Sequence, residues 1–300
     1  MKKLVSMVLA FVILCSAFCV SVSAAGRIGD ANGDGNLTAI DARMILQHVA
    51  DIKVLDDTSN LDMNGDKKVT AVDARVILQV VAGIIDDPLK VQQMQMFVDS
   101  FNNVKKNAYA VTHTNSKLYN YNNYVYIHPV IEGLYNAAVG AGAPSLKEEL
   151  TVEFSDELRP VNKTYKGEDI ALEFPPVGGT CNLTMNDISK ISFEESGEYY
   201  IVEITVKGKK NPSRYESIGN VATIITKEDL ESEMDPDDLE KMSLNCDYKD
   251  AIVKAKIEKE TGNMIEYSVD YPMIMTTNIS GIGKSIEIGM GFYEEWTIRY

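Results

Sequence analysis

The spacing of apolar positions divides the chain into a helical first part and a strand-rich second part. Two similar segments, ARMILQHVADI at 42–52 and ARVILQVVAGI at 74–84, repeat 32 positions apart with apolar residues at helical spacing. Because a repeated loop–helix unit cannot bury its own apolar face, we expect the two copies to pack on each other. The same spacing predicts an amphipathic helix over 89–107 and another near 130–139.

Beyond about residue 195 the pattern changes to the alternation that is typical of β-strands. It runs through 200–206, and it continues on both sides of the turn at 260–263, which predicts a hairpin. A third run of one parity, 286–300, is interrupted by Glu294. Thr226 and Asp229 form a capping-box pattern, which predicts a short acidic helix through about Met242. The apolar positions expected to share one face of the hairpin are Val253, Ala255, Ile257, Ile265, Tyr267, Val269 and Tyr271.

These elements predict an α+β chain with two domains. The residue before a proline disfavours helix, so Asp86-Asp87-Pro88 is the expected hinge. We therefore place a small all-α domain at 26–86. A larger domain at 88–300 is long enough for its own core. In this second domain we expect an antiparallel sheet covered by helices.

Each repeated helix follows a twelve-residue loop rich in oxygen-bearing side chains. The loops are DANGDGNLTAID at 30–41 and DMNGDKKVTAVD at 62–73. Ca²⁺ takes six to eight oxygen ligands at about 2.3–2.6 Å, and such a loop supplies them from positions 1, 3, 5, 7 and 12. Two acidic surface turns are the alternative, but the same spacing found twice favours two calcium ions. The expected ligands are Asp30, Asn32, Asp34, Asn36 (carbonyl), Asp41, Asp62, Asn64, Asp66, Lys68 (carbonyl) and Asp73.

The loops differ at position 6, where the chain must turn sharply. Gly35 adopts a positive φ freely, whereas Lys67 in the second loop carries a steric penalty there. We therefore expect a weaker second site. Position 12 is Asp in both loops, and Asp41 and Asp73 also open the following helices, where a carboxylate favours the exposed N–H groups.

The two segments GDANGDGNLTAIDARMILQHVADI and LDMNGDKKVTAVDARVILQVVAGI resemble a type I dockerin over roughly residues 28–85. The resemblance implies duplicated EF-hand-like calcium loops and docking onto a cohesin module of a scaffold protein, as in cellulosomes. Best-known members often carry Ser-Thr at the first two contact positions, where this chain is apolar. The family's partner-binding positions fall here on Ala39, Ile40, Gln47, Ala71, Val72 and Gln79.

The N-terminus predicts export. A basic start, an apolar stretch and small residues ending near Ala25 form a signal peptide over 1–25, so we expect a secreted, extracellular or scaffold-associated protein. No later apolar run is long enough to span a membrane.

Without Lys2 and Lys3 the chain keeps 27 basic and 44 acidic residues, a charge near −17 that disfavours nucleic acid as a partner. Only Cys181 and Cys246 remain, either as a disulfide or as two buried thiols.

The larger domain contains no recognisable catalytic motif. His113 and His128 lack metal-ligand spacing, and the acidic pairs Glu194/Glu195 and Glu294/Glu295 are adjacent on strands, so the members of each pair point to opposite faces. The segment LYNYNNYVYIHP places Tyr119, Tyr121, Tyr124 and Tyr126 close together. These rings form either a polysaccharide-binding surface or an edge strand with half-buried tyrosines.

We therefore assign no catalytic residue. The sequence favours a dockerin protein carrying a non-catalytic binding or structural module. The alternative is a polysaccharide- or peptide-degrading enzyme with an unrecognised active site.

Overall fold

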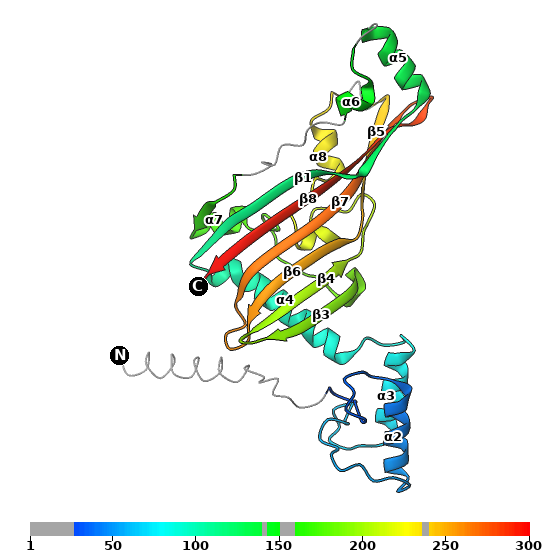
Figure 1. Ribbon diagram of the computed structural model, residues 1–300, viewed down its shortest axis with the longest axis vertical. Helices are drawn as coiled ribbons and strands as arrows, with labels where there is room; N and C mark the ends of the chain where they lie inside the picture. The colour runs from blue at the N-terminus through cyan, green and yellow to red at the C-terminus, as the bar shows by residue number, and fades with distance from the viewer. Residues whose placement is uncertain (1–26, 140–142, 151–159, 236–239) are drawn as a thin grey trace, which may run out of the picture. The chain divides into compact units, whose positions relative to one another are not determined.

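The computed structural model describes residues 27–139, 143–150, 160–235 and 240–300 (Figure 1). The signal peptide expected at 1–25 lies outside these residues. The chain divides into two compact units between Gln93 and Met94. In the described part of the chain, no helix is both long and apolar enough to cross a membrane.

The first unit is built on helices α2 (Ala39–Val49) and α3 (Ala71–Val81), which pack on each other as the repeat predicts. Thr38 and Thr70 begin the two helices with complete capping boxes. In both helices the residue after the C-cap is left-handed, Asp51 after α2 and Gly83 after α3. The shared core consists of equivalent residues from both repeats together with the connecting segment: Ala42, Ile45, Leu61, Met63, Ala74 and Ile77.

The two ends of the first unit are joined by an ion pair. The Arg27 guanidinium donates to the Asp87 carboxylate, 60 positions away in the sequence, and both side chains are largely shielded from water. Arg27 also donates to the carbonyl of Gly35 at 3.1 Å, within the first loop. This residue therefore connects the first loop to the end of the repeat.

The second unit begins within helix α4 (Pro88–Asn107), close to its predicted bounds. Its apolar stripe, Met94, Phe97, Phe101 and Val104, is buried. The other helices are α5 (Pro129–Val139), α6 (Leu146–Leu150), α7 (Glu168–Glu173), α8 (Lys227–Ser232) and the 3₁₀ turns η2 (Met185–Asp187) and η3 (Ser217–Asn220).

An eight-stranded antiparallel sheet confirms the α+β prediction. Its order is β2-β1-β8-β7-β6-β4-β3, with β5 also paired to β7 (Figure 1). The C-terminal run of one parity forms a single long strand next to β1. The strands are β1 (Ala110–Ile127), β2 (Lys163–Lys166), β3 (Ile188–Ser196), β4 (Tyr199–Val206), β5 (Met242–Tyr248), β6 (Ala251–Glu258), β7 (Met264–Ile279) and β8 (Gly283–Arg299).

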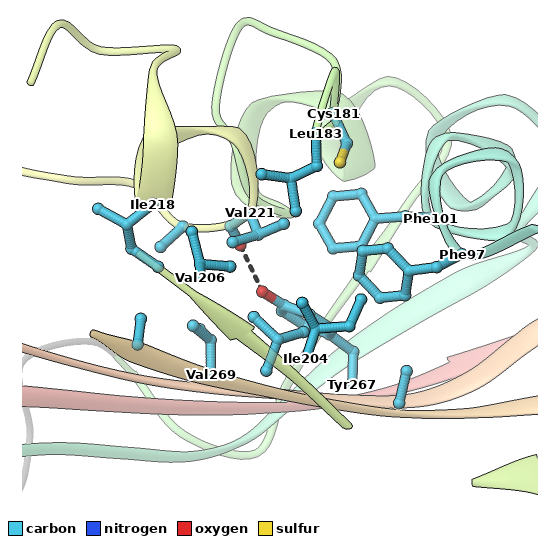
Figure 2. Close-up of a cluster of buried hydrophobic side chains, with 14 of the residues drawn as sticks. Phe97, Phe101, Cys181, Leu183, Ile204, Val206, Ile218, Val221, Tyr267 and Val269 are labelled. Carbon is cyan, nitrogen blue, oxygen red and sulfur yellow. Dashed lines mark hydrogen bonds between the residues drawn. The ribbon is translucent and has the colours of Figure 1, made fainter. Parts of the chain in front are cut away.

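One face of the sheet packs against α4 and the segments that cover it; we call this the inner face. Figure 2 shows Phe97 and Phe101 of α4 above Ile204 and Tyr267 of the sheet. The Phe101 and Tyr267 rings meet edge to face with centroids 5.0 Å apart. The Tyr267 hydroxyl donates to the carbonyl of Val221, which satisfies a polar group deep in the core.

Two local predictions were wrong. The helix opened by Thr226 ends at Ser232, and Met242 begins strand β5 rather than ending the helix. A bulge after Lys256 shifts the hairpin register, so Met264 is buried and Ile265 is only half-buried. An extra residue of this kind reverses the inside–outside alternation at the start of a strand.

Cys181 and Cys246 are both buried free thiols rather than a disulfide. Burial raises the pKa of Cys181 to about 12 and that of Cys246 to about 11. The thiolate is the reactive form, so both side chains are inert near neutral pH.

Candidate functional site

The first residue of each twelve-residue loop organises the turn that follows it. Asp30 accepts the backbone N–H of Gly33 at 2.8 Å and that of Gly35 at 2.7 Å. Asp62 occupies the same place in the second loop and accepts Gly65 and Lys67 at the same two distances. The two loops therefore share one hydrogen-bonded frame, as their common sequence pattern requires.

The last residue of each loop is a buried carboxylate. Asp41 accepts the backbone N–H and the hydroxyl of Thr38, both at 2.8 Å, and thereby completes the capping box of α2. Its other oxygen accepts the N–H groups of Ala31 and Asn32 at 3.1 and 3.3 Å. The sequence predicted a carboxylate at the start of the helix, but neither the capping box with Thr38 nor the contacts with Ala31 and Asn32. The carboxylate links the start of the loop to the start of the helix.

Asp73 makes the equivalent contacts in the second repeat. It accepts the N–H groups of Met63 and Asn64 at 2.8 and 3.2 Å, and the N–H and hydroxyl of Thr70 at 2.7 and 3.1 Å. Asp41 and Asp73 are both fully buried. Each carboxylate is stabilised by four hydrogen bonds, which compensates for the loss of water.

The middle of the first loop is exposed and polar. Asn32 donates to Asp34 at 2.8 Å, and the other Asp34 oxygen accepts the N–H of Asn36 at 2.8 Å. The pKa of Asp34 is lowered, first by the Asn36 backbone hydrogen bond and then by the Asn32 side chain. Asp34 is therefore held in the charged form that a cation requires.

The donor set of each loop fits calcium in chemical type. Three carboxylates, an amide oxygen and a backbone carbonyl are the hard oxygen ligands that Ca²⁺ prefers. Within the described residues, no group of three or more His, Cys, Asp or Glu side chains forms a metal cluster by itself. The donor set expected from the sequence also includes the amide of Asn32 or Asn64 and the carbonyl at position 7.

The backbone at position 6 is left-handed in both loops. Gly35 has φ of 82°, and Lys67 has φ of 67°. Lys67 therefore has the positive φ that the sequence predicted, a conformation that costs a residue with a side chain roughly 1–2 kcal/mol.

The solvent side of each helix bears the residues expected to contact a partner. Ala39, Ile40, Ala71 and Val72 are exposed, whereas Gln47 and Gln79 are half-buried. The sequence analysis did not single out further exposed side chains in the same places of both helices. The helical spacing of the surface positions could have identified them. They are Arg43, Leu46, Val49, Arg75, Leu78 and Val81.

In the second unit the inner face contains a group of buried polar side chains. His113 stacks on Trp296 with ring centroids 4.2 Å apart, which places it in the core. Ser116 lies opposite Glu294 in the β1–β8 register, and the Tyr271 hydroxyl donates to Glu294 at 3.0 Å. Glu295, the next residue, lies on the outer face, so the expected separation of this acidic pair is confirmed. His128 accepts the N–H of Val130 at the start of α5.

The predicted tyrosines lie on strand β1, which pairs with β2 only at Ala110–His113. On the outer face the Tyr119 ring lies over Gly291, where a Cβ atom would come within 2.0 Å of the ring. The Tyr119 hydroxyl donates to Asp270 at 2.6 Å, and that of Tyr124 donates to Glu287. Burial, followed by the Asp270 hydrogen bond, raises the pKa of Tyr119.

Comparison with known proteins identifies the first unit. Residues 28–81 match the family model of the dockerin type I domain. This segment is therefore identified as a type I dockerin module; modules of this family are EF-hand-like, bind calcium and dock onto cohesins in cellulosome-type assemblies. No curated protein matches the chain, and no solved structure matches it.

Replacing Lys67 with Gly should tighten calcium binding by the second loop several-fold, because the left-handed conformation costs Lys roughly 1–2 kcal/mol more than Gly. Calorimetric titration of the full chain with calcium measures the change. Lys68→Gly removes the same charge at a neighbouring position with no positive φ. Equal affinities for the Lys67→Gly and Lys68→Gly proteins would show that charge, not backbone strain, sets the difference.

Proposed function

We propose that this protein is a secreted dockerin protein that binds two calcium ions and attaches a non-catalytic C-terminal domain to a cohesin-bearing scaffold. The observation that carries the proposal is the frame shared by both loops, in which equivalent carboxylates make equivalent hydrogen bonds. Binding of purified cohesin modules to the full chain, in calcium and in chelator, tests it.

The first ion is assigned to Asp30, Asn32, Asp34, Asp41 and the Asn36 carbonyl. The second is assigned to Asp62, Asn64, Asp66, Asp73 and the Lys68 carbonyl. When bound, calcium neutralises three carboxylates in each loop. Asp41 and Asp73 then couple each ion to a helix, because both residues also cap α2 and α3.

The partner-binding role is assigned to Ala39, Ile40, Gln47, Ala71, Val72 and Gln79. Ile40 is 48% exposed and Val72 is 38% exposed, and with Leu46 and Leu78 they give each helix several exposed apolar side chains at equivalent places. Exposed apolar patches of this kind mark interaction sites.

Calcium should fold the isolated segment 27–93. Without the ion, repulsion among the carboxylates opposes the compact state, so binding free energy becomes folding free energy. Circular dichroism should show helix gained on adding calcium, and full helicity in excess chelator would refute the coupling. Asp30→Ala and Asp62→Ala should each lower the stoichiometry from two ions to one, whereas Asp56→Ala, outside both loops, should not.

The two repeats should let a cohesin bind in two orientations related by about a half-turn. Ile40→Asp or Val72→Asp alone should then weaken binding only a few-fold, whereas the double variant should abolish it. Calorimetry measures the affinities, with Val91→Asp as a control at an exposed apolar residue of α4. If either single substitution abolished binding, the cohesin would bind in one orientation only, which would contradict the prediction.

For the C-terminal domain, polysaccharide binding is a second candidate function. The Tyr119 ring lies on the outer face of the sheet, positioned by Gly291 beneath it and by its hydrogen bond to Asp270. Tyr124 is 37% exposed on the same strand. Aromatic rings beside carboxylates suit sugar rings and hydroxyls, and each stacking contact contributes about 0.5–1.5 kcal/mol.

The Tyr121→Ala/Tyr124→Ala protein should lose retention on plant polysaccharide by about tenfold, and Tyr119→Ala should show a similar loss. Tyr109→Ala serves as the control, because Tyr109 is an exposed tyrosine that immediately precedes β1. No hydrolysis of polysaccharide or casein is expected from the purified chain. Turnover that persists through further purification would favour the alternative, a degrading enzyme with an unrecognised site.

A further inference from the structure

The solvent-facing stripe of each dockerin helix has an arginine near its centre. In α2 the residues that point into the core are Asp41, Ala42 and Ile45, and Arg43 projects from the opposite side of the helix. In α3 the core residues are Asp73, Ala74 and Ile77, and Arg75 takes the equivalent position. The charge is therefore duplicated together with the fold.

Each arginine has an exposed apolar side chain three positions before it and another three positions after it. Arg43 is flanked by Ile40 and Leu46, and Arg75 by Val72 and Leu78; all four apolar side chains are exposed. We call the two sets, Ile40/Arg43/Leu46 and Val72/Arg75/Leu78, the arginine stripes. A stripe of this composition provides apolar area for an interface and a single cation within it, a combination that is frequent at interface hot spots.

Neither arginine has a carboxylate partner among the described residues. The ion pairs of this part of the chain do not include Arg43 or Arg75. The residues three and four positions from Arg43 in α2, such as Ile40 and Gln47, are uncharged. No ion pair along the helix therefore competes with a partner's carboxylate for the Arg43 guanidinium. The guanidinium donors therefore point outward from a protein whose net charge is −15.

We propose that the cohesin bound by this protein presents a carboxylate within an apolar surface, and that Arg43 or Arg75 pairs with it according to which repeat is engaged. This inference rests on the proposed cohesin docking. Charge complementarity identifies the occupant, since a guanidinium placed in an apolar contact needs a carboxylate, ideally in a bidentate pair. A second copy of the chain fits less well, because two-fold contact of the stripes would bring the arginines together.

The test compares charge reversals on and off the stripes. A panel of purified cohesin modules is titrated with the full wild-type chain in calcium, and the tightest binder becomes the probe. Arg43→Glu/Arg75→Glu should weaken binding by about hundredfold or more, whereas either single reversal should cost only a few-fold. Lys53→Glu/Lys90→Glu makes the same change in net charge at exposed positions outside the stripes, and it should cost less than about threefold.

Two further measurements assign the partner group. Wild-type affinity should fall as salt rises, and this dependence should weaken in Arg43→Gln/Arg75→Gln. Reversing the contacting acidic residue of the cohesin to Lys should restore binding to the double Glu variant. Circular dichroism in calcium confirms that each variant is folded.

The outcomes separate the two proposals. If the wild-type chain binds no cohesin, the proposed docking function fails. If the wild-type chain binds a cohesin but Arg43→Glu/Arg75→Glu loses no more affinity than Lys53→Glu/Lys90→Glu, the docking function stands and the arginine inference is overturned. Self-association of the wild-type chain that the stripe reversals abolish, with no cohesin bound, would also overturn the inference.

Discussion

The order of the dockerin module depends on two buried carboxylates, Asp41 and Asp73. Each accepts hydrogen bonds from the beginning of its loop and from the first turn of its helix, so loop and helix become one unit. A buried carboxylate is stable only when its oxygens are satisfied, and here four N–H or O–H groups do so. The same residues belong to the expected calcium ligand set. With this proposed ligand set, ion binding and helix capping would be coupled through one side chain in each repeat.

Duplication extends this coupling to the surface. Because the repeats share the core positions Ala42/Ala74 and Ile45/Ile77, equivalent positions of their helices face solvent. Ile40 and Val72, Arg43 and Arg75, and Leu46 and Leu78 are then equivalent pairs. The duplication that builds the shared core therefore also places similar side chains on the solvent side of both helices. The difference between Gly35 and Lys67 shows that the loops have not remained equal in backbone strain.

Local signals made much of this structure predictable. The loop spacing located both loops of the calcium type and placed Asp41 and Asp73 at the starts of the following helices, because each depends on residues close in sequence. Apolar alternation likewise located β4, the β6–β7 hairpin and β8. The bulge after Lys256 was not predicted, since register depends on pairing between strands. The links from Asp41 and Asp73 back to the loop starts depend on the folded turn, and no pattern in the sequence encodes them directly.

The C-terminal domain shows why acidic residues could not be assigned from sequence. Glu294 and Glu295 are adjacent, yet Glu294 lies on the inner face, bonded to Tyr271, and Glu295 lies on the outer face. The inward group, which includes His113 and Ser116, is almost completely buried in the described structure, so it cannot meet a polymer from solvent. A large ligand would instead encounter the outer face, where Gly291 leaves room for the Tyr119 ring. The small residue and the cross-strand ring act together, because any side chain at 291 would displace the ring. Which acidic and aromatic side chains are accessible on this domain therefore follows from the face that each residue occupies, a property that strand pairing decides.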